Sequence, residues 1–393
     1  MSSEDRVLYL PPRHPIHRLS DELRAEFVAA QRIVIAVAFP DAHSFCERVL
    51  SDLKLSISPP DELRGRPVTD VADMEFSELE DLFDGMLVSS SIPASARQMH
   101  AENLSRRAQL VRAFDDPDTV LGWVTNKVKE VIEDLPKTAA DIEVGRNPGD
   151  VLDPYLVAAT QALLCEGDFR QAISATVTHK ALMILEGLMG HLHEEVIGQM
   201  RGNVRNPEPR ATNAEILDYQ YNPFPGADVV QPPLFDGDTL KLHQIKSKTG
   251  TMNSSGGKRL AEQMRQLRMA YANAELFSHS LVGNTLRGHR SMGGMVRVEP
   301  SLVVLVGQAS FEVLTSSHSG PELLVRVYQA AFELAAEETG YSVENMTNVI
   351  VQTFIERAEA EGEGYLESIV HQSTRGDAAN MDSRTYSGRR KGR

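Results

Sequence analysis

The sequence predicts a mixed α/β fold, in which a mixed central sheet is flanked by helices and follows a mainly helical N-terminal region. Apolar residues recur at helical spacing in much of residues 1–170, and short strand-like runs alternate with helical patterns from about residue 175. The 393 residues exceed the usual size of a single core. We therefore expect a helical region over 1–170, a sheet-bearing region over 171–374 and a polar, disordered basic tail over 375–393.

Two helices are predicted most clearly in the N-terminal region. Ser20 is a capping-type residue followed by apolar residues at helical spacing. Residues 118–134 continue that pattern, with Pro117 just ahead of them as a start signal. The Pro-Pro pair at 59–60 and the acidic stretch over 61–84 are typical of a loop or a weakly ordered connector.

The sheet-bearing region begins with a predicted helix and a basic, proline-containing loop, at 177–200 and 203–213. Short strand-like runs and turn residues predict strands after this loop, and helical patterns predict the helices between and behind them. The expected strands are 215–221, 227–230, 239–246, 280–284 and 302–306. The expected helices are 258–274 and two or three within 310–361.

The composition favours a cytoplasmic protein over a secreted or membrane protein. Cys46 and Cys165 are too few for a disulfide framework, and neither belongs to a CxxC pair. The first residues contain no apolar stretch of the kind that a signal peptide needs. The longest apolar run near them, 33–39, is too short to cross a bilayer.

Charge is distributed unevenly along the chain. The formal net charge of −15 argues against a protein that coats nucleic acid without specificity. From Lys241 to Arg297, however, ten lysine and arginine residues are accompanied by only two glutamates. This excess of positive charge inside an acidic chain indicates a surface or cleft for a polyanion, although a solvated helix face would have the same composition.

Asp228, Gln244 and Lys246 are the residues whose spacing points most directly to catalysis. Asp228 begins one predicted strand, and Gln244 and Lys246 lie two residues apart on the next. Because side chains alternate along a strand, Gln244 and Lys246 share one face, opposite His243 and Ile245. The segment between the strands has the composition of a hairpin turn, so Asp228 is expected to face both residues.

This set of side chains offers what hydrolysis of a phosphodiester needs. The Asp228 carboxylate and the Gln244 amide oxygen are ligands of the kind that Mg²⁺ prefers. A bound Mg²⁺ would polarise the scissile phosphate and lower the pKa of a bound water. Lys246 would orient that water and offset negative charge in the transition state.

The pattern resembles the PD-(D/E)xK nuclease superfamily, in which an acidic residue is followed by an acidic-x-Lys triplet on the neighbouring strand. The resemblance covers residues 178–310 and implies a restriction-endonuclease-like core. Ala227 stands in place of the proline, and Gln244 replaces the second carboxylate, as glutamine or asparagine does in some restriction endonucleases of the superfamily. Members often supply a further glutamate from the preceding helix, which assigns Glu194, with Glu195 next to it, as a catalytic residue and metal ligand.

Other residues near the motif have simpler structural explanations. Asp236 and Asp238 are competing acids, but their Phe-Asp-Gly-Asp-Thr setting is typical of a turn. His191 and His193 suggest zinc, but residues two apart on a helix point away from each other and no HExxH spacing is present. The alternative for the whole motif is a surface hairpin with an exposed lysine.

Basic residues that follow the motif are candidate DNA contacts. A small, polar, glycine-bearing segment opens the helix predicted at 258–274 and would bring backbone N–H groups and cations to phosphates. A second segment, over 283–291, is rich in groups that contact bases or phosphates, although a flexible surface loop has a similar composition. The candidates are Lys248, Lys258, Arg259, Arg287 and Arg290.

These features together predict a type II restriction endonuclease that makes Mg²⁺-dependent double-strand cuts in DNA. The segments His-Gln-Ile-Lys-Ser-Lys-Thr-Gly and Gly-Asn-Thr-Leu-Arg-Gly-His-Arg also resemble the BstXI-type group, which implies an interrupted palindromic site. A cut at a palindrome needs two active sites related by a two-fold axis, so a homodimer or a higher even-numbered assembly is expected. The alternatives are a repair or phage-defence nuclease with the same core, and a DNA-binding module without catalysis.

Overall fold

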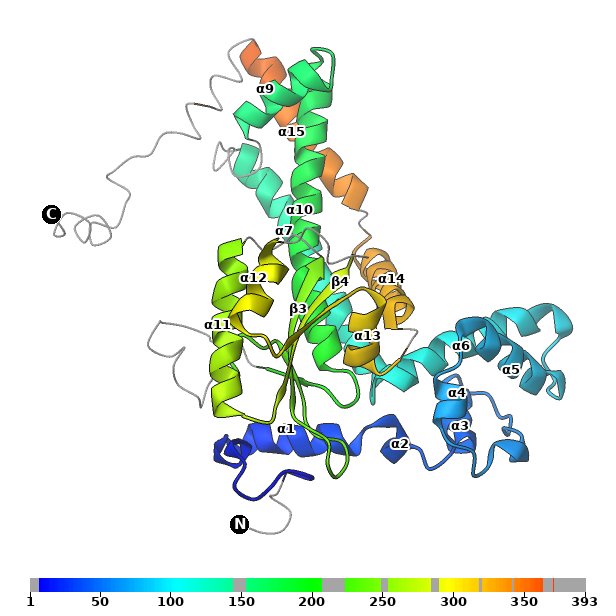
Figure 1. Cartoon of the computed structure of the whole chain (residues 1–393). Coiled ribbons are helices and arrows are strands. Elements are labelled where there is room, and N and C mark those ends of the chain that lie inside the picture. The colour runs from blue at the N-terminus through cyan, green and yellow to red at the C-terminus, as the bar shows by residue number, and fades with distance from the viewer. Residues whose placement is uncertain are drawn as a thin grey trace. The chain divides into compact units, whose positions relative to one another are not determined.

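The computed structural model describes residues 7–143, 153–206, 223–248, 254–283, 290–317, 320–340, 343–362 and 370. It has a five-stranded mixed sheet and many helices, which confirms the mixed α/β class (Figure 1). The chain divides into two compact units, of which the first comprises 1–124 and 189–331 and the second 125–188 and 332–393. Both units are therefore discontinuous in sequence, and the predicted tail lies outside the described residues. No described helix is both long and apolar enough to cross a membrane.

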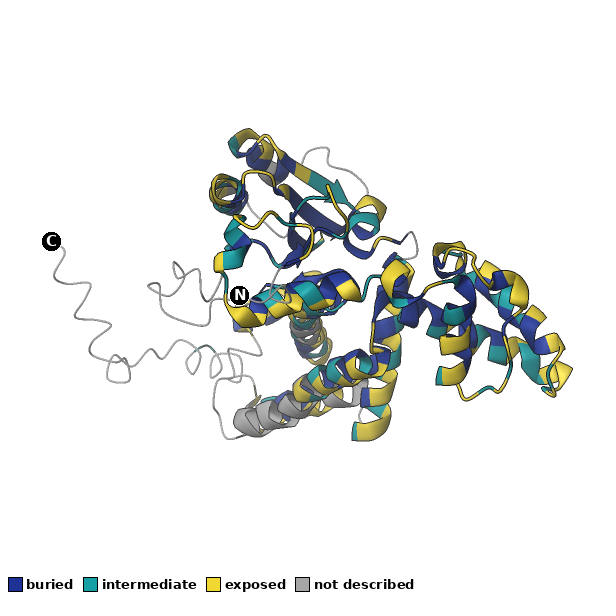
Figure 2. Cartoon of the chain, turned by 90° about the horizontal axis from the view of Figure 1, so that it is seen from below, coloured by how far each residue is buried: buried dark blue, intermediate teal, exposed yellow. Residues whose placement is uncertain are grey.

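Helices over residues 35–111 of the first unit pack around an apolar core of their own, whereas residues 16–30 belong to the core shared with the sheet. The acidic stretch over 61–84, predicted as a loop or connector, is helical in large part, so that prediction was wrong. Leu79 and Phe83 of α5 are fully buried at helical spacing, and the acidic residues lie outside the core of residues 35–111. Figure 2 shows helices that carry buried residues on one side and exposed residues on the other. The helices are η2 (Pro15–Arg18), α1 (Asp21–Arg32), α2 (Ile35–Ala38), α3 (Ala42–Asp52), η3 (Asp61–Leu63), α4 (Thr69–Ala72), α5 (Phe76–Val88) and α6 (Ala94–Ala113).

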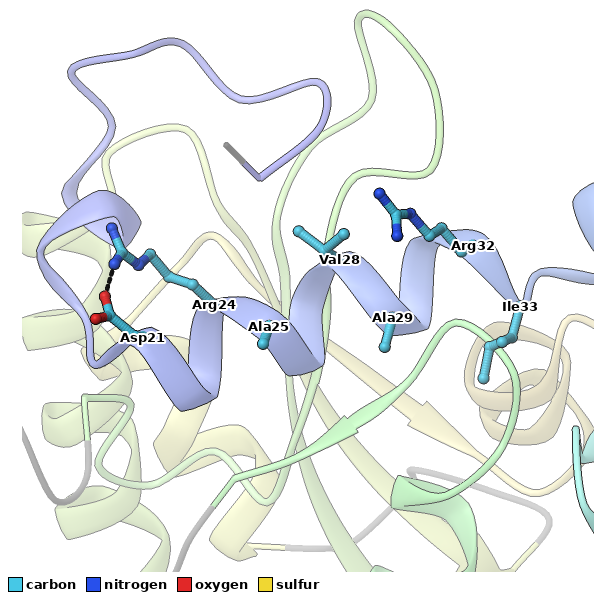
Figure 3. A pocket seen from close by; sticks show the side chains of 7 residues that line it. All are labelled: Asp21, Arg24, Ala25, Val28, Ala29, Arg32 and Ile33. Carbon is cyan, nitrogen blue, oxygen red and sulfur yellow. Dashed lines mark ion pairs between the residues drawn. The ribbon is translucent and has the colours of Figure 1, made fainter. Parts of the chain in front are cut away.

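Helix α1 forms where the sequence predicts it. The Ser20 hydroxyl accepts a hydrogen bond from Leu23 N at 3.3 Å, which caps the helix. Leu23 and Phe27 are buried in the core shared with the sheet. An open hollow of about 640 Å³ runs along the opposite side of α1 between Arg24 and Arg32 (Figure 3). None of the predicted site residues lines the part of this hollow that the structure describes.

The sheet has the strand order β1-β2-β3-β4-β5. The first three strands pair antiparallel and the last three parallel, so β3 belongs to both arrangements. Residues 227–230 and 239–246 do form the predicted hairpin, whereas the strand predicted over 215–221 lies outside the described residues. The strands are β1 (Val204–Arg205), β2 (Val229–Gln231), β3 (Lys241–Lys248), β4 (Glu275–Val282) and β5 (Leu302–Val306).

Several elements of the first unit differ from the predicted boundaries; the helix predicted over 258–274, for example, spans Ser254–Ala270. Strand β1 lies inside the segment predicted as a loop, because the antiparallel β2 gives Val204 and Arg205 backbone partners. Strand β4 begins five residues earlier than predicted, paired with β3 along most of its length. Helix α12 begins at Arg290, at the end of the segment predicted as a contact loop.

Helices lie on both sides of this sheet (Figure 1). Helices α11 (Ser254–Ala270) and α12 (Arg290–Val298), together with α1, bury apolar residues against one face of the sheet. Leu242, Leu276 and Leu302 supply that face from three neighbouring strands. Helix α13 (Gln308–Thr315) packs on β4 and β5, and the end of α10 lies against β1.

The regular structure in the described part of the second unit is helical. Its core contains Val157, Ile173, Val177 and Phe354. The described helices that have residues in the second unit are α7 (Pro117–Glu143), α9 (Pro154–Leu163), α10 (Phe169–Gly198), α14 (Gly320–Thr339) and α15 (Val343–Glu361). Three of them, α7, α10 and α14, also have residues in the first unit. The helices predicted over 118–134, 177–200 and within 310–361 are thus confirmed, with α7 and α10 longer than expected.

Candidate active site

The hairpin brings Asp228 and Gln244 face to face. Asp228 immediately precedes β2, and its N–H donates to His243 O at 2.7 Å. One carboxylate oxygen, Oδ2, accepts a hydrogen bond from Ile245 N at 2.7 Å and lies 3.5 Å from Gln244 Nε2. The predicted juxtaposition of Asp228 and Gln244 across the strand pair is therefore confirmed, and the β3 backbone itself orients the carboxylate.

A tight turn before β2 sets the position of Asp228. Gly226 has a φ of 94°, a backbone conformation that residues with a Cβ rarely adopt. A Cβ at Gly226 would also lie 3.1 Å from Gln263 Cβ on α11. The buried Asn206 amide closes the turn by donating to Phe224 O at 2.9 Å and to Ala227 O at 2.7 Å.

Gln244 is buried between β2 and β4. Its Nε2 points to Asp228 and donates to Ile245 O at 3.0 Å, and its Oε1 accepts from Ser278 Oγ at 3.2 Å. In this arrangement the amide oxygen faces Ser278 and not the Asp228 carboxylate. The assigned role of Gln244 as a metal ligand therefore requires its amide to turn over, which exchanges the positions of the oxygen and the nitrogen.

Lys246, near the end of β3, lies close to Glu194 of α10. Lys246 Nζ lies 4.0 Å from Glu194 Oε1, with the lysine side chain 35% exposed and the glutamate side chain 16% exposed. Glu195 is 36% exposed and contacts Arg205. Of the two glutamates that the sequence offers, Glu194 is thus the one that lies against the QxK strand.

Arg205 is a residue of this site that the sequence did not predict. It contacts Glu194, Glu195 and the backbone of Asp228. It forms ion pairs with Glu194 and Glu195, both at 3.1 Å. Its Nη1 donates to Asp228 O at 2.8 Å. In the sequence Arg205 is one of two arginines in the basic segment 203–213, and no spacing signal distinguishes it from the other.

The opposite face of β3 and β4 carries a buried pair of histidines. His243 Nδ1 lies 3.0 Å from His279 Nε2, and both rings are stacked against Phe277. Burial lowers the pKa of His279 to about 3, and burial together with the neighbouring His279 lowers the pKa of His243 well below its usual value. Both imidazoles are therefore neutral in the folded protein near pH 7.

We expect this pair to make the free energy of unfolding depend on pH. The folded-state pKa values lie below the unfolded value of about 6.5, so protons bind preferentially to the unfolded chain as the pH falls below 6.5. Chemical denaturation should show a loss of about 1.4 kcal/mol per histidine between pH 7.5 and 5.5. The variant His279→Leu should lose less over the same interval, whereas His191→Gln, at an exposed position, should match the wild type. Equal slopes for His279→Leu and the wild type would contradict this account.

The other candidates near the motif, two aspartates as alternative acids and two histidines as alternative metal ligands, have the structural roles that the sequence predicts. Asp238 accepts hydrogen bonds from Leu234 N at 3.0 Å and Thr239 N at 2.8 Å, which stabilises the hairpin turn, and Asp236 is exposed. His193 Nδ1 lies 2.8 Å from the Tyr328 hydroxyl, and burial lowers the pKa of His193 to about 4. His193 is thus a packed residue of α10.

The predicted DNA contacts lie at the end of β3 and on α11. Lys248 is exposed at the last residue of β3, and Lys258 and Arg259 are exposed in the first turns of α11. Arg287 lies outside the described residues, and for Arg290 the structure describes the backbone at the start of α12. These five residues remain predictions as DNA contacts.

Asp228 and Glu194 are the acidic residues of this site that could bind a hard cation. Carboxylate oxygens come from Asp228 and Glu194, and Mg²⁺ is commonly held by one or two carboxylates, with water and phosphate oxygens as its other ligands. Among the residues that the structure describes, no group of three or more histidine, cysteine, aspartate or glutamate side chains is arranged to hold a metal ion. The described residues therefore offer two candidate carboxylate ligands, Asp228 and Glu194, and no complete set of protein ligands.

No protein-family model matches the chain, and no curated protein matches it.

Proposed function

We propose that the chain is a type II restriction endonuclease of the PD-(D/E)xK type, which makes Mg²⁺-dependent double-strand cuts in DNA. The observation that carries this proposal is a pair of contacts on neighbouring residues of β3: Gln244 lies across the hairpin from Asp228, and Lys246, two residues later, lies 4.0 Å from Glu194 of α10. An Asp followed by QxK is common by chance in sequences. An Asp that faces the glutamine across a hairpin, with a helical glutamate beside the lysine, is a far more restrictive arrangement.

The surrounding fold also supports the proposal. The mixed sheet is flanked by helices on both faces, as expected for a restriction-endonuclease-like core. Helix α10 precedes the hairpin and supplies Glu194, in the order that the resemblance implies. Helix α11 follows it with Lys258 and Arg259 exposed, next in sequence to the proposed centre.

The side chains would share the work of hydrolysis as follows. Asp228 and Glu194 would hold the cation, and the N–H of Ile245 keeps the Asp228 carboxylate in place. When bound, Mg²⁺ would act as a Lewis acid toward the phosphate and would lower the pKa of a water. Lys246, partly exposed beside Glu194, would orient the attacking water by a hydrogen bond and offset the negative charge of the transition state.

The substrate in this proposal is double-stranded DNA with a palindromic or interrupted palindromic site. Each copy of the chain has one such centre, so cutting both strands at a two-fold symmetric site calls for a homodimer or a higher even-numbered assembly. Lys248, Lys258 and Arg259 would contact phosphates near the scissile bond. Their contribution would weaken steeply as the salt concentration rises.

Incubation of the purified full-length protein with bacteriophage DNA and Mg²⁺ tests this function. Discrete fragments are the expected result, and chelation of the cation should abolish them. A smear would indicate a general nuclease of the repair or defence kind. Intact DNA that is retained by the protein would indicate a binding module and would overturn the proposed catalysis.

A further inference from the structure

Arg205 connects the helix and the hairpin that form the proposed centre. Its three guanidinium nitrogens are all used: Nε pairs with Glu195, Nη2 with Glu194, and Nη1 donates to Asp228 O. The distances are 3.1, 3.1 and 2.8 Å, and the arginine side chain is only 16% exposed. Arg205, on the edge strand β1, thus links Glu194 and Glu195 of α10 to the backbone of Asp228.

Arg205 is better placed than Lys246 to orient Glu194. The Arg205–Glu194 contact is 3.1 Å, whereas the Lys246–Glu194 contact is 4.0 Å. A guanidinium is a planar, rigid fork, so its hydrogen bonds fix the direction of a carboxylate as well as its distance. A lysine at position 205 would keep the positive charge but would lose the planar arrangement of several N–H donors.

The stem of Arg205 is fixed by close packing on α10. Gly198, the last residue of α10, has no side chain at the point where the helix passes β1. A Cβ at Gly198 would lie 2.8 Å from Arg205 Cβ, a distance shorter than Cβ atoms in proteins show. It would also lie 3.1 Å from Arg205 Cα and Cδ, which is a tight contact. The glycine therefore lets the strand approach the helix closely enough for Arg205 to reach Glu194 and Glu195, one turn earlier.

We propose that Arg205 is a positioning residue that holds the Glu194 carboxylate ready for a divalent cation, and so sets the cation concentration at which the centre fills. This inference rests on the proposed nuclease function. Arg205 need not touch the phosphate or the attacking water in this role. Its loss should therefore raise the half-saturating cation concentration much more than it lowers the cleavage rate at saturating cation.

The variant Arg205→Lys tests this role in the full-length protein. Titration calorimetry with Mn²⁺ and no DNA should give a half-saturating concentration about tenfold higher than in the wild type, because the charge stays but Glu194 is no longer oriented. The rate of DNA cleavage at saturating Mg²⁺ should change by less than about threefold. Arg48→Lys, at an exposed arginine that pairs with Asp52 on α3, is the matched control and should bind Mn²⁺ like the wild type.

The outcomes separate this inference from the proposed function. If the wild type cleaves DNA and Arg205→Lys binds Mn²⁺ as tightly as the wild type, the positioning role is wrong and the nuclease stands. If the wild type neither binds Mn²⁺ nor cleaves DNA, both proposals are wrong. Should Arg205→Lys melt far below the wild type, Gly198→Ala provides the test, since it displaces the stem of Arg205 and removes no charge. It should also raise the half-saturating Mn²⁺ concentration, and an unchanged value would overturn the role.

Discussion

Replacing Asp228 with asparagine is expected to lower the rate of DNA cleavage at least about 1000-fold, which corresponds to about 4 kcal/mol of transition-state stabilisation. The substitution removes the charged ligand from the centre. It keeps an oxygen that can accept the hydrogen bond from Ile245 N, so the end of the hairpin should remain formed. Single-turnover cleavage of phage DNA at saturating Mg²⁺ measures the effect, and thermal melting shows whether the fold is retained.

The choice of asparagine matters because Asp228 also has a structural role. An alanine would leave the buried N–H of Ile245 without this acceptor, at a cost of about 1–3 kcal/mol in folding free energy. Asp236→Asn is the matched control, since Asp236 is exposed in the turn of the same hairpin. Its cleavage rate should equal that of the wild type. Full activity in Asp228→Asn would show that the centre has been assigned to the wrong residues.

Replacing Arg201 with methionine is expected to reduce the free energy of unfolding by about 3–4 kcal/mol. The Arg201 side chain is only 2% exposed and donates to Val111 O at 3.0 Å and to Ile33 O at 2.7 Å. It also lies over the Phe39 ring, 5.4 Å from its centroid. Methionine fills much of the same volume but leaves both carbonyl oxygens without their donor.

Chemical denaturation of Arg201→Met beside Arg48→Met measures this effect. Arg48 is 42% exposed and pairs with Asp52 one helical turn away, so its loss should cost less than about 0.5 kcal/mol. If Arg201→Met reduced the free energy of unfolding by less than 1 kcal/mol, the hydrogen bonds of Arg201 to Val111 O and Ile33 O would not have the stabilising role proposed for them. The cleavage rate of the folded fraction should be unchanged, because Arg201 does not contact the proposed centre.

The central hairpin could be predicted because two local signals agree there. Residues 227–230 and 239–246 are short strand-like runs, and the segment between them has turn residues at the right length. The face that Gln244 presents followed from the alternation of side chains along a strand. The orientation of its amide did not, since that depends on Ser278, which β4 brings from 34 residues away.

Other features depend on contacts that leave no local pattern. Strand β1 has two residues, too few for any periodicity, and exists because β2 provides backbone partners. The role of Arg205 requires β1 to lie beside α10, which a sequence without tertiary contacts does not reveal. In α5 the acidic composition concealed the spacing of Leu79 and Phe83, which is the signal that identifies the helix.

The most direct test of the central claim compares two lysines of the same strand. Lys246→Met removes the ammonium beside Glu194, and Lys241→Met removes one that pairs with Asp238 in the hairpin, at the other end of β3. Each variant and the wild type are incubated with phage DNA at saturating Mg²⁺, and DNA binding is measured in parallel. We expect the wild type and Lys241→Met to produce the same discrete fragments, and Lys246→Met to bind the DNA but leave it intact. Cleavage by Lys246→Met at the rate of Lys241→Met would contradict the assignment of this centre.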